Sequence, residues 1–128
     1  MQDIISLYRN YNHYNHLTDK DLETYLEPSI NLNQYKKHYK DKKLIGFTNW
    51  AFLSDSNLEK FKTTGIIELS EWNSGNNLVF VFLIALENVR NIFYWCINKA
   101  KEFIYLNKNF TWLRIENDKV RKIITRQR

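Results

Sequence analysis

The chain has 128 residues, and its 44% of hydrophobic and 16% of aromatic side chains exclude a disordered chain. The formal net charge of +5 resides in residues 119–128, which hold five basic and no acidic side chains, whereas residues 1–118 are neutral. A nucleic-acid-binding protein that is basic throughout is therefore disfavoured. No apolar run reaches the ~18 residues of a membrane span, and the N-terminus shows no secretion signal. We expect a single cytoplasmic domain over residues 1–128.

Two helices are predicted at the N-terminal end. Residues 3–12 place apolar side chains at helical spacing. After an interruption, Thr18 followed three residues later by Asp21 gives the pattern of a capping box, which predicts the start of a second helix. Pro28 lacks the backbone N–H that a helix interior needs, so we expect the second helix to end or kink there.

A hairpin and a short helix are predicted next. Residues 34–39 form the first plausible strand, and residues 43–53, dense in β-forming side chains, form the returning one. The Asp41-Lys42 pair between them predicts the turn. Ser54 then predicts the N-terminal cap of a short helix that runs through Lys62.

The C-terminal half predicts a sheet covered by a helix. Residues 70–77 form a polar loop, and the apolar run 78–86 is typical of a strand buried on both faces at the centre of a sheet. Apolar side chains then recur at offsets of three and four over residues 88–104, which predicts an amphipathic helix. Residues 110–116 and 119–125 predict a final pair of strands. The chain thus predicts an α+β domain, an α/β sandwich with helices flanking a mostly antiparallel sheet of about five strands.

Few residues offer chemistry. Cys96 lies on the apolar stripe of the predicted long helix, so we interpret it as a buried core thiol. His13 and His16 are three residues apart, but two ligands without a carboxylate partner make a poor metal site. His38 lies among lysines and is interpreted as a surface residue. The chain has no paired-cysteine motif, glycine-rich phosphate loop or serine–histidine–aspartate pattern, so we expect no cofactor and no metal.

Three segments are candidate docking surfaces for a protein partner. The basic hairpin could hold an acidic protein or a phosphate backbone, although lysines also protect the edge of a sheet from unwanted pairing. The polar loop offers a tryptophan, which often anchors interfaces, and the basic C-terminal segment offers arginines. The candidate binding residues are Lys36, Lys37, Lys40, Lys42, Lys43, Trp72, Asn73, Asn76, Asn77, Arg121 and Arg126.

Several short motifs occur in the order in which a known family carries them. They are Asp21-Leu22-Glu23, Pro28, Asn33-Gln34-Tyr35, Trp50-Ala51-Phe52-Leu53-Ser54, Glu71-Trp72-Asn73-Ser74-Gly75 and the apolar run 78–86. Over about residues 14–90 the chain resembles the RTX toxin-activating lysine acyltransferases of the hemolysin C type. The resemblance implies a fold like the GCN5-type N-acetyltransferases. It also implies transfer of a fatty acyl group from acyl carrier protein to a lysine of a protoxin.

The catalytic residues of that family carry over badly. The resemblance places Phe82 at the position of the family's catalytic aspartate, and a phenyl ring can neither accept a proton nor orient a base. Counting back from Pro28 without a gap places Tyr14 at the position of the catalytic histidine. His16 reaches that position only through a two-residue deletion. Both chemical groups are therefore expected to be missing, and no catalytic residue is expected.

The leading hypothesis is a non-catalytic, protein-binding relative of the acyltransferases, most concretely an immunity-type protein that neutralises a cognate bacterial toxin. An alternative is an active lysine acyltransferase in which His16 is the general base, with acyl carrier protein and a protoxin as partners. A third hypothesis is a nucleic-acid accessory protein that works through the basic C-terminal segment, although the neutral body makes nucleic acid a disfavoured partner.

Overall fold

The computed structural model describes residues 1–10, 16–103, 109–116 and 119–127, the last two segments by their backbone course alone. The elements are α1 (Gln2–Tyr8), α2 (Asp19–Asn31), β1 (Tyr35–Lys40), β2 (Lys43–Leu53), α3 (Asp55–Thr64), the short 3-10 helix η2 (Leu69–Glu71), β3 (Asn77–Ala85), α4 (Val89–Lys101), β4 (Asn109–Glu116) and β5 (Lys119–Gln127).

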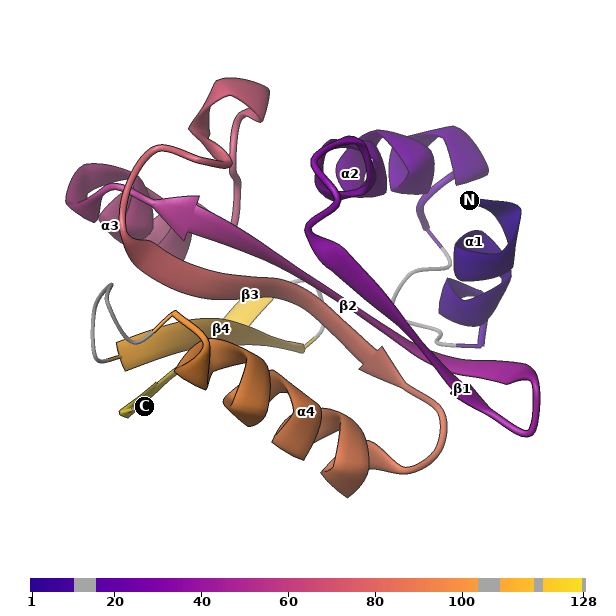
Figure 1. Ribbon diagram of the computed structural model, residues 1–128. Helices are drawn as coiled ribbons and strands as arrows, with labels where there is room; N and C mark the ends of the chain where they lie inside the picture. Colours follow the sequence, from indigo (N-terminus) through magenta and orange to yellow (C-terminus); the bar gives the residue numbers. More distant parts are fainter. Residues whose placement is uncertain (11–15, 104–108, 117–118, 128) are drawn as a thin grey trace.

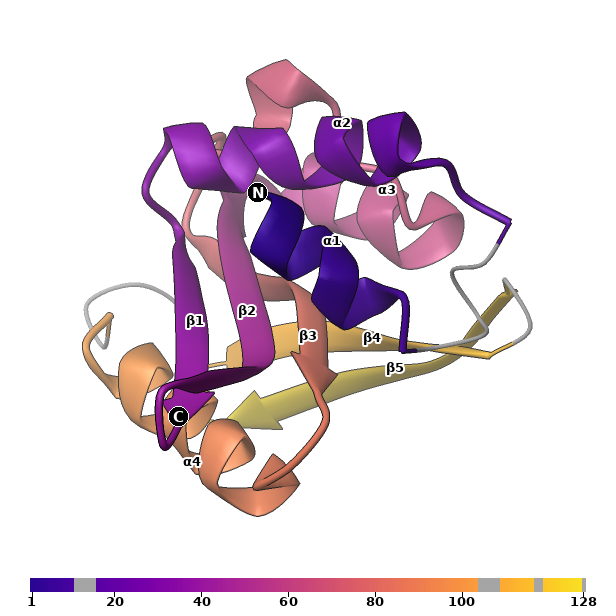
Figure 2. The same ribbon diagram turned by 90° about the vertical axis from the view of Figure 1, so that its right-hand side faces the viewer.

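One sheet in the order β1-β2-β3-β4-β5 organises the molecule (Figure 1). The first three strands are mutually antiparallel, β3 pairs with β4 in parallel over residues 78–80, and β4 pairs with β5 antiparallel. Helices α1, α2, α3 and η2 cover one face, here called the α2 face, and α4 covers the other, the α4 face (Figures 1 and 2). The mixed α and β content and the antiparallel β1–β3 unit agree with the α+β class predicted from the sequence.

Helix α2 begins where the sequence predicts and continues past Pro28. The Thr18 side chain accepts a hydrogen bond from the N–H of Asp21, and the Asp21 carboxylate accepts one from the N–H of Thr18, both at 3.0 Å. Of the two outcomes expected at Pro28, an end or a kink, the end is wrong, because the helix continues to Asn31. The carbonyl of Pro28 accepts a hydrogen bond from the N–H of Leu32, so the last turn remains closed.

Two further local signals determine the structure as predicted. Asp41 and Lys42 both adopt positive φ angles of 50° and 68°, the geometry of a tight hairpin turn whose twist matches the flanking strands. The Ser54 hydroxyl accepts a hydrogen bond from the N–H of Asn57 and caps α3. Gly65, with a φ of 72°, ends that helix in the left-handed conformation, which a residue without a side chain adopts at little cost.

The core consists of two clusters on the α2 face and one on the α4 face. The first packs α1 and α2 on the sheet around Phe47 and Ile84, and the second packs α3 and Trp72 around Val79. The third lies under α4 and includes Cys96, which is 2% exposed. The interpretation of Cys96 as a buried core thiol is confirmed, and burial raises its thiol pKa to about 12.

The interpretation of His38 as a surface residue is wrong, since its side chain is only 8% exposed. Side chains alternate along β1, and His38 points to the α4 face, whereas Lys37 points to the other face and pairs with Asp3 of α1. Its Nε2 atom lies 2.9 Å from the hydroxyl of Thr48, and its ring packs edge-on against Trp95 at 5.2 Å. Burial first, and then the charge of Lys36, lower the pKa of His38 to about 4.

This buried histidine makes stability depend on pH. The unfolded chain binds a proton at His38 near the ordinary pKa of 6.5, whereas the folded chain binds it only near pH 4. The contribution of neutral His38 to the free energy of unfolding is therefore complete above pH 6.5. It is lost as the pH falls from 6.5 to 4, which lowers the free energy of unfolding by up to about 3 kcal/mol. Urea unfolding of the wild type and of His38→Gln at pH 7, 5.5 and 4.5 measures this. We expect the wild type to lose stability relative to the variant; parallel pH profiles would contradict the account.

Candidate functional site

A pocket of about 510 Å³ opens on the α2 face, between α2 and the segment that follows α3. Five residues of α2 between positions 24 and 31 form one wall, and residues 65–69 with Trp72 form the other. Val81 and Phe82 of β3 also line it and link the two walls across the sheet. Its volume lies in the range of about 300–1,000 Å³ that is typical of ligand pockets, so we regard it as the candidate site.

A β-bulge brings both Val81 and Phe82 to this pocket. At this point Asn49 of β2 lies opposite two residues of β3 instead of one. The pairing is regular on either side, with the pairs Trp50–Phe80 and Thr48–Leu83. One extra residue in β3 therefore shifts the alternation of its side chains between the two faces of the sheet.

The contacts of the side chains along β3 show the shift directly. Phe80 packs in the α4-face cluster, and so does Leu83, three residues later rather than two or four. Val81 and Phe82 between them both pack on the α2 face, Val81 against the cluster around Trp72 and Phe82 against the cluster under α1 and α2. The pocket thus lies at the boundary between the two clusters of that face.

Asn49 fastens the bulge to the wall of the pocket. Its side-chain oxygen accepts a hydrogen bond from the N–H of Phe82 at 2.7 Å, which the irregular register leaves without a regular ladder partner. Its side-chain nitrogen donates to the hydroxyl of Ser29 on α2 at 2.9 Å, and that hydroxyl donates to the carbonyl of Leu26. Asn49 and Ser29 are both fully buried, so the bonds from Asn49 to Ser29 and from Ser29 to Leu26 form away from competing water.

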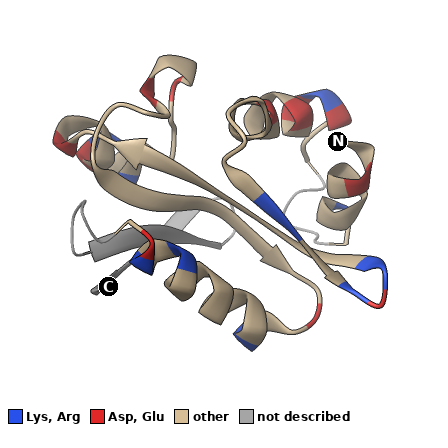
Figure 3. Cartoon of the chain, viewed as in Figure 1, with Lys and Arg blue, Asp and Glu red and all other residues tan. Residues whose placement is uncertain are grey.

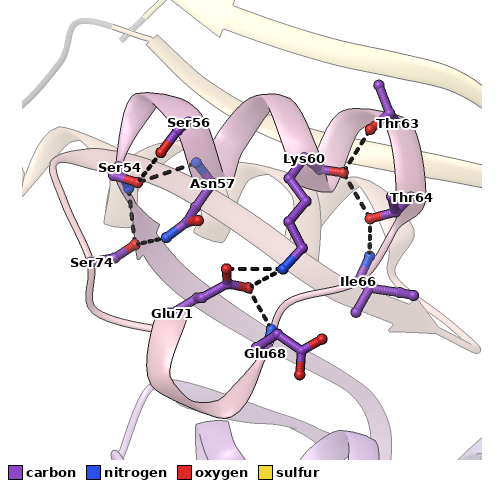
Figure 4. A network of polar contacts seen from close by, with 10 residues as sticks. All are labelled: Ser54, Ser56, Asn57, Lys60, Thr63, Thr64, Ile66, Glu68, Glu71 and Ser74. Carbon is purple, nitrogen blue, oxygen red and sulfur yellow. Dashed lines mark hydrogen bonds and ion pairs between the residues drawn. The ribbon is translucent and has the colours of Figure 1, made fainter.

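A polar network holds the opposite wall on α3 (Figure 4). The Glu71 carboxylate accepts hydrogen bonds from the Lys60 ammonium at 3.0 Å and from the N–H of Glu68 at 2.8 Å. The bond from Glu68 and then the Lys60 ammonium lower the pKa of Glu71. Ser74 accepts hydrogen bonds from the N–H of Ser54 and from the side chain of Asn57. Residues 65–74 therefore form a braced wall.

The predicted basic hairpin lies away from this pocket, at the far edge of the sheet. Three of its lysines form ion pairs within the chain: Lys37 with Asp3 at 2.8 Å, and Lys40 and Lys43 with Glu87 at 3.4 and 3.5 Å. The Asp3 carboxylate raises the pKa of Lys37, and Lys40 and Lys43 lower the pKa of Glu87. Lys36 and Lys42 are exposed. Three of the five lysines that were candidates for docking are therefore paired with carboxylates of the same chain.

The polar loop divides into buried and exposed residues. Trp72, predicted as a binding residue, is 3% exposed because it packs in the core cluster under α3, although it also lines the pocket. Asn73 and Asn76 are exposed, whereas Asn77 donates hydrogen bonds to the carbonyl of Leu53 and to the Asp55 carboxylate. Gly75 is required here, since an added Cβ would approach the backbone of Ser54 to 2.5 Å.

Of the remaining candidate residues from the sequence, the structure describes the side chain of His16 alone. His16 is exposed, lies before the N-cap of α2 and does not line the pocket. His13 and Tyr14 lie outside the described residues, and so do the side chains of Arg121 and Arg126, of which only the course of β5 is described. Within the described ranges, no three His, Cys, Asp or Glu side chains form a group that could hold a metal ion.

Sequence reasoning missed most of the pocket. Among the large hydrophobic side chains that are strongly exposed, Tyr25, Ile66 and Leu69 line it, at 51%, 56% and 74% exposure. The run Ile66-Ile67-Glu68-Leu69 could have indicated this surface, because exposed apolar residues that gather in a connection between two elements often mark a binding site.

In the part of the chain that the structure describes, no helix has the length and hydropathy of a membrane span.

Comparison with known proteins agrees with the sequence motifs. The model of the RTX toxin acyltransferase family matches residues 1–127. An uncharacterized protein of Synechocystis sp. is 39% identical over an alignment of 108 residues, and the match covers 79% of this chain and 70% of that protein. The chain belongs to the RTX toxin acyltransferase family.

Asn49 supplies a direct test of the site's construction. In Asn49→Ala the N–H of Phe82 loses its acceptor, and the Ser29 hydroxyl loses its donor while keeping its bond to the carbonyl of Leu26. We therefore expect a loss of about 2–4 kcal/mol in the free energy of unfolding. Asn76→Ala, an exposed asparagine, is the matched control and should change stability by less than about 0.5 kcal/mol. Chemical denaturation measures both. A loss below about 1 kcal/mol for Asn49→Ala would show that the bulge does not depend on it.

Proposed function

We propose that this chain is a non-catalytic member of the acyltransferase family, which binds a protein partner at the pocket on the α2 face. The observation that carries the proposal is the position of Phe82. The sequence resemblance places the family's catalytic aspartate there, and the ring of Phe82 lines the pocket and packs edge-on against Tyr8 at 6.1 Å. An apolar ring at that point favours binding and removes a group that could orient a base.

The rest of the pocket lining supports the same conclusion. Among the described residues, the carboxylates that line it are Glu27 and Glu68, which belong to the two opposite walls, and no described histidine lines it. General acid–base chemistry requires a base within hydrogen-bond reach of the reacting atom, held by a third group. The hydrogen bonds of Asn49 and Ser29 go to each other and to backbone groups of Phe82 and Leu26. These two side chains therefore stabilise the backbone and do not orient a catalytic base.

We further infer that the domain has the GCN5-type N-acetyltransferase-like architecture. Two features support this. Strands β3 and β4 are parallel but pair only over residues 78–80 and 110–112, although both extend further, so they diverge beyond Phe80. A bulge follows immediately in β3, and bulges in such positions turn side chains toward a site. Loss of chemistry on a retained fold is common, because function resides in the site.

The most specific form of the proposal is an immunity-type protein that neutralises a cognate bacterial toxin by stoichiometric binding. The alternative is an active lysine acyltransferase that takes a fatty acyl group from acyl carrier protein and transfers it to a protoxin. Membership of the family favours the alternative. Against it, His16 is exposed and does not line the pocket.

An acyl-transfer assay separates the two functions. The chain is incubated with acyl carrier protein charged with a labelled fatty acid and with a candidate protoxin, beside an active member of the family. Because a positioned acid or base contributes about 10²–10⁴-fold, we expect a transfer rate at least about 100-fold below that of the active member. His16→Ala should leave the residual rate unchanged.

Two outcomes would reject the proposal. Label transfer at the rate of the active member, abolished in His16→Ala, would establish the enzyme. Failure of the purified chain to bind any protein of its native cell with a dissociation constant below about 1 μM, equivalent to about −8 kcal/mol, would reject the immunity form.

The neighbouring genes also discriminate between the two functions. A repeat-rich protoxin gene favours the enzyme, and a toxin gene with a variable C-terminal domain favours immunity.

A further inference from the structure

We propose that the pocket on the α2 face receives a segment of a partner protein that carries bulky apolar side chains flanked by lysine or arginine. This inference rests on the proposed binding function and names the chemistry of the partner. It also moves the expected interface away from the basic hairpin, which the sequence had suggested.

The first observation is the segregation of charge between the two faces. Residues 1–31 and 54–76, which form the α2 face and its flanks, hold nine acidic and four basic side chains. Residues 36–43 and 87–102, which form the hairpin and α4, hold eight basic and three acidic ones. Figure 3 shows this division, with red concentrated on the helices above the sheet and blue on the hairpin and α4. A neutral body therefore has an acidic side and a basic side.

The second observation is that the acidic side carries the apolar pocket. Three strongly exposed hydrophobic side chains, Tyr25, Ile66 and Leu69, line it beside the carboxylates of Glu27 and Glu68. Among the described residues, Glu27 forms no ion pair, whereas several other acids of this face are neutralised by Arg9, Lys60 and Lys62. Apolar anchors within a polar rim are the usual form of a protein interface, and complementary charge selects the partner.

A third observation concerns hydrogen bonding. Trp72 lines the pocket and is 3% exposed, and its indole N–H is buried without an acceptor among the described residues. A buried donor that lacks an acceptor costs about 1–3 kcal/mol. The wall of the pocket therefore contains a polar group that the described residues leave unsatisfied.

The same charges disfavour other occupants. A fatty-acid carboxylate, an anionic lipid head group, a nucleic acid or an acidic protein would approach Glu27, Glu68 and a face of net negative charge. Lysine or arginine flanking an apolar segment gains from that field instead, and the gain weakens as salt screens it. The occupant that satisfies both the apolar lining and the acidic rim is therefore a basic, apolar segment.

Fluorescence polarisation with a labelled peptide of leucine and lysine, in which the leucines recur at helical spacing, tests the proposal. One matched peptide has glutamate in place of lysine, and another has serine in place of leucine. We expect the leucine–lysine peptide to bind at least tenfold more tightly than either. Its affinity should fall about tenfold in Leu69→Ser and in Glu27→Gln, and should weaken from 50 to 500 mM salt.

Val89→Ser is the matched control, because Val89 is 58% exposed on α4 and its replacement should leave the affinity unchanged. Equal binding of the glutamate peptide, or an equal loss of affinity in Val89→Ser, would overturn the proposal. So would binding of a fluorescent fatty acid in the absence of peptide binding, or self-association that Leu69→Ser abolishes. None of these outcomes depends on the acyl-transfer assay, so the two claims fail separately.

Discussion

The hydrogen bonds of Asn49 are the constraint on which the rest of the site depends. A bulge in a central strand leaves a backbone N–H without a ladder partner, and a buried N–H must find another acceptor. The side-chain oxygen of Asn49 is that acceptor for the N–H of Phe82, and its side-chain nitrogen donates to Ser29 of α2. One side chain therefore turns two adjacent residues of β3 to the same face and holds the helix that forms the wall of the pocket.

The elements that the sequence predicted well are those determined locally. The capping pair Thr18 and Asp21, the Ser54 cap and the Asp41-Lys42 turn each act within a few residues, and each lies where it was expected. The helix does not end at Pro28. His38 was misjudged because Thr48 and Trp95, which are distant in the sequence, bury it. The bulge could not be predicted either, because residues 78–86 are apolar throughout and their pattern is the same with or without a phase shift.

The distribution of charge in the folded chain differs from the distribution along the sequence. The sequence separates a neutral body from a basic end, and the fold then divides the neutral body into an acidic face and a basic face. The hairpin lysines that suggested docking are partly paired with Asp3 and Glu87, while the apolar pocket opens among carboxylates. In the proposed function, a member of the family with Phe82 lining that pocket holds a partner without transferring a group to it.

The most direct test of this account is to map the interface by backbone amide chemical shifts in a titration with the leucine–lysine peptide. We predict that the largest changes fall in α2 between residues 24 and 31, in residues 65–72 and at the bulge of Val81 and Phe82. Changes confined to the hairpin at residues 36–43 or to α4 would contradict the account, because they would place the binding surface on the opposite face of the sheet.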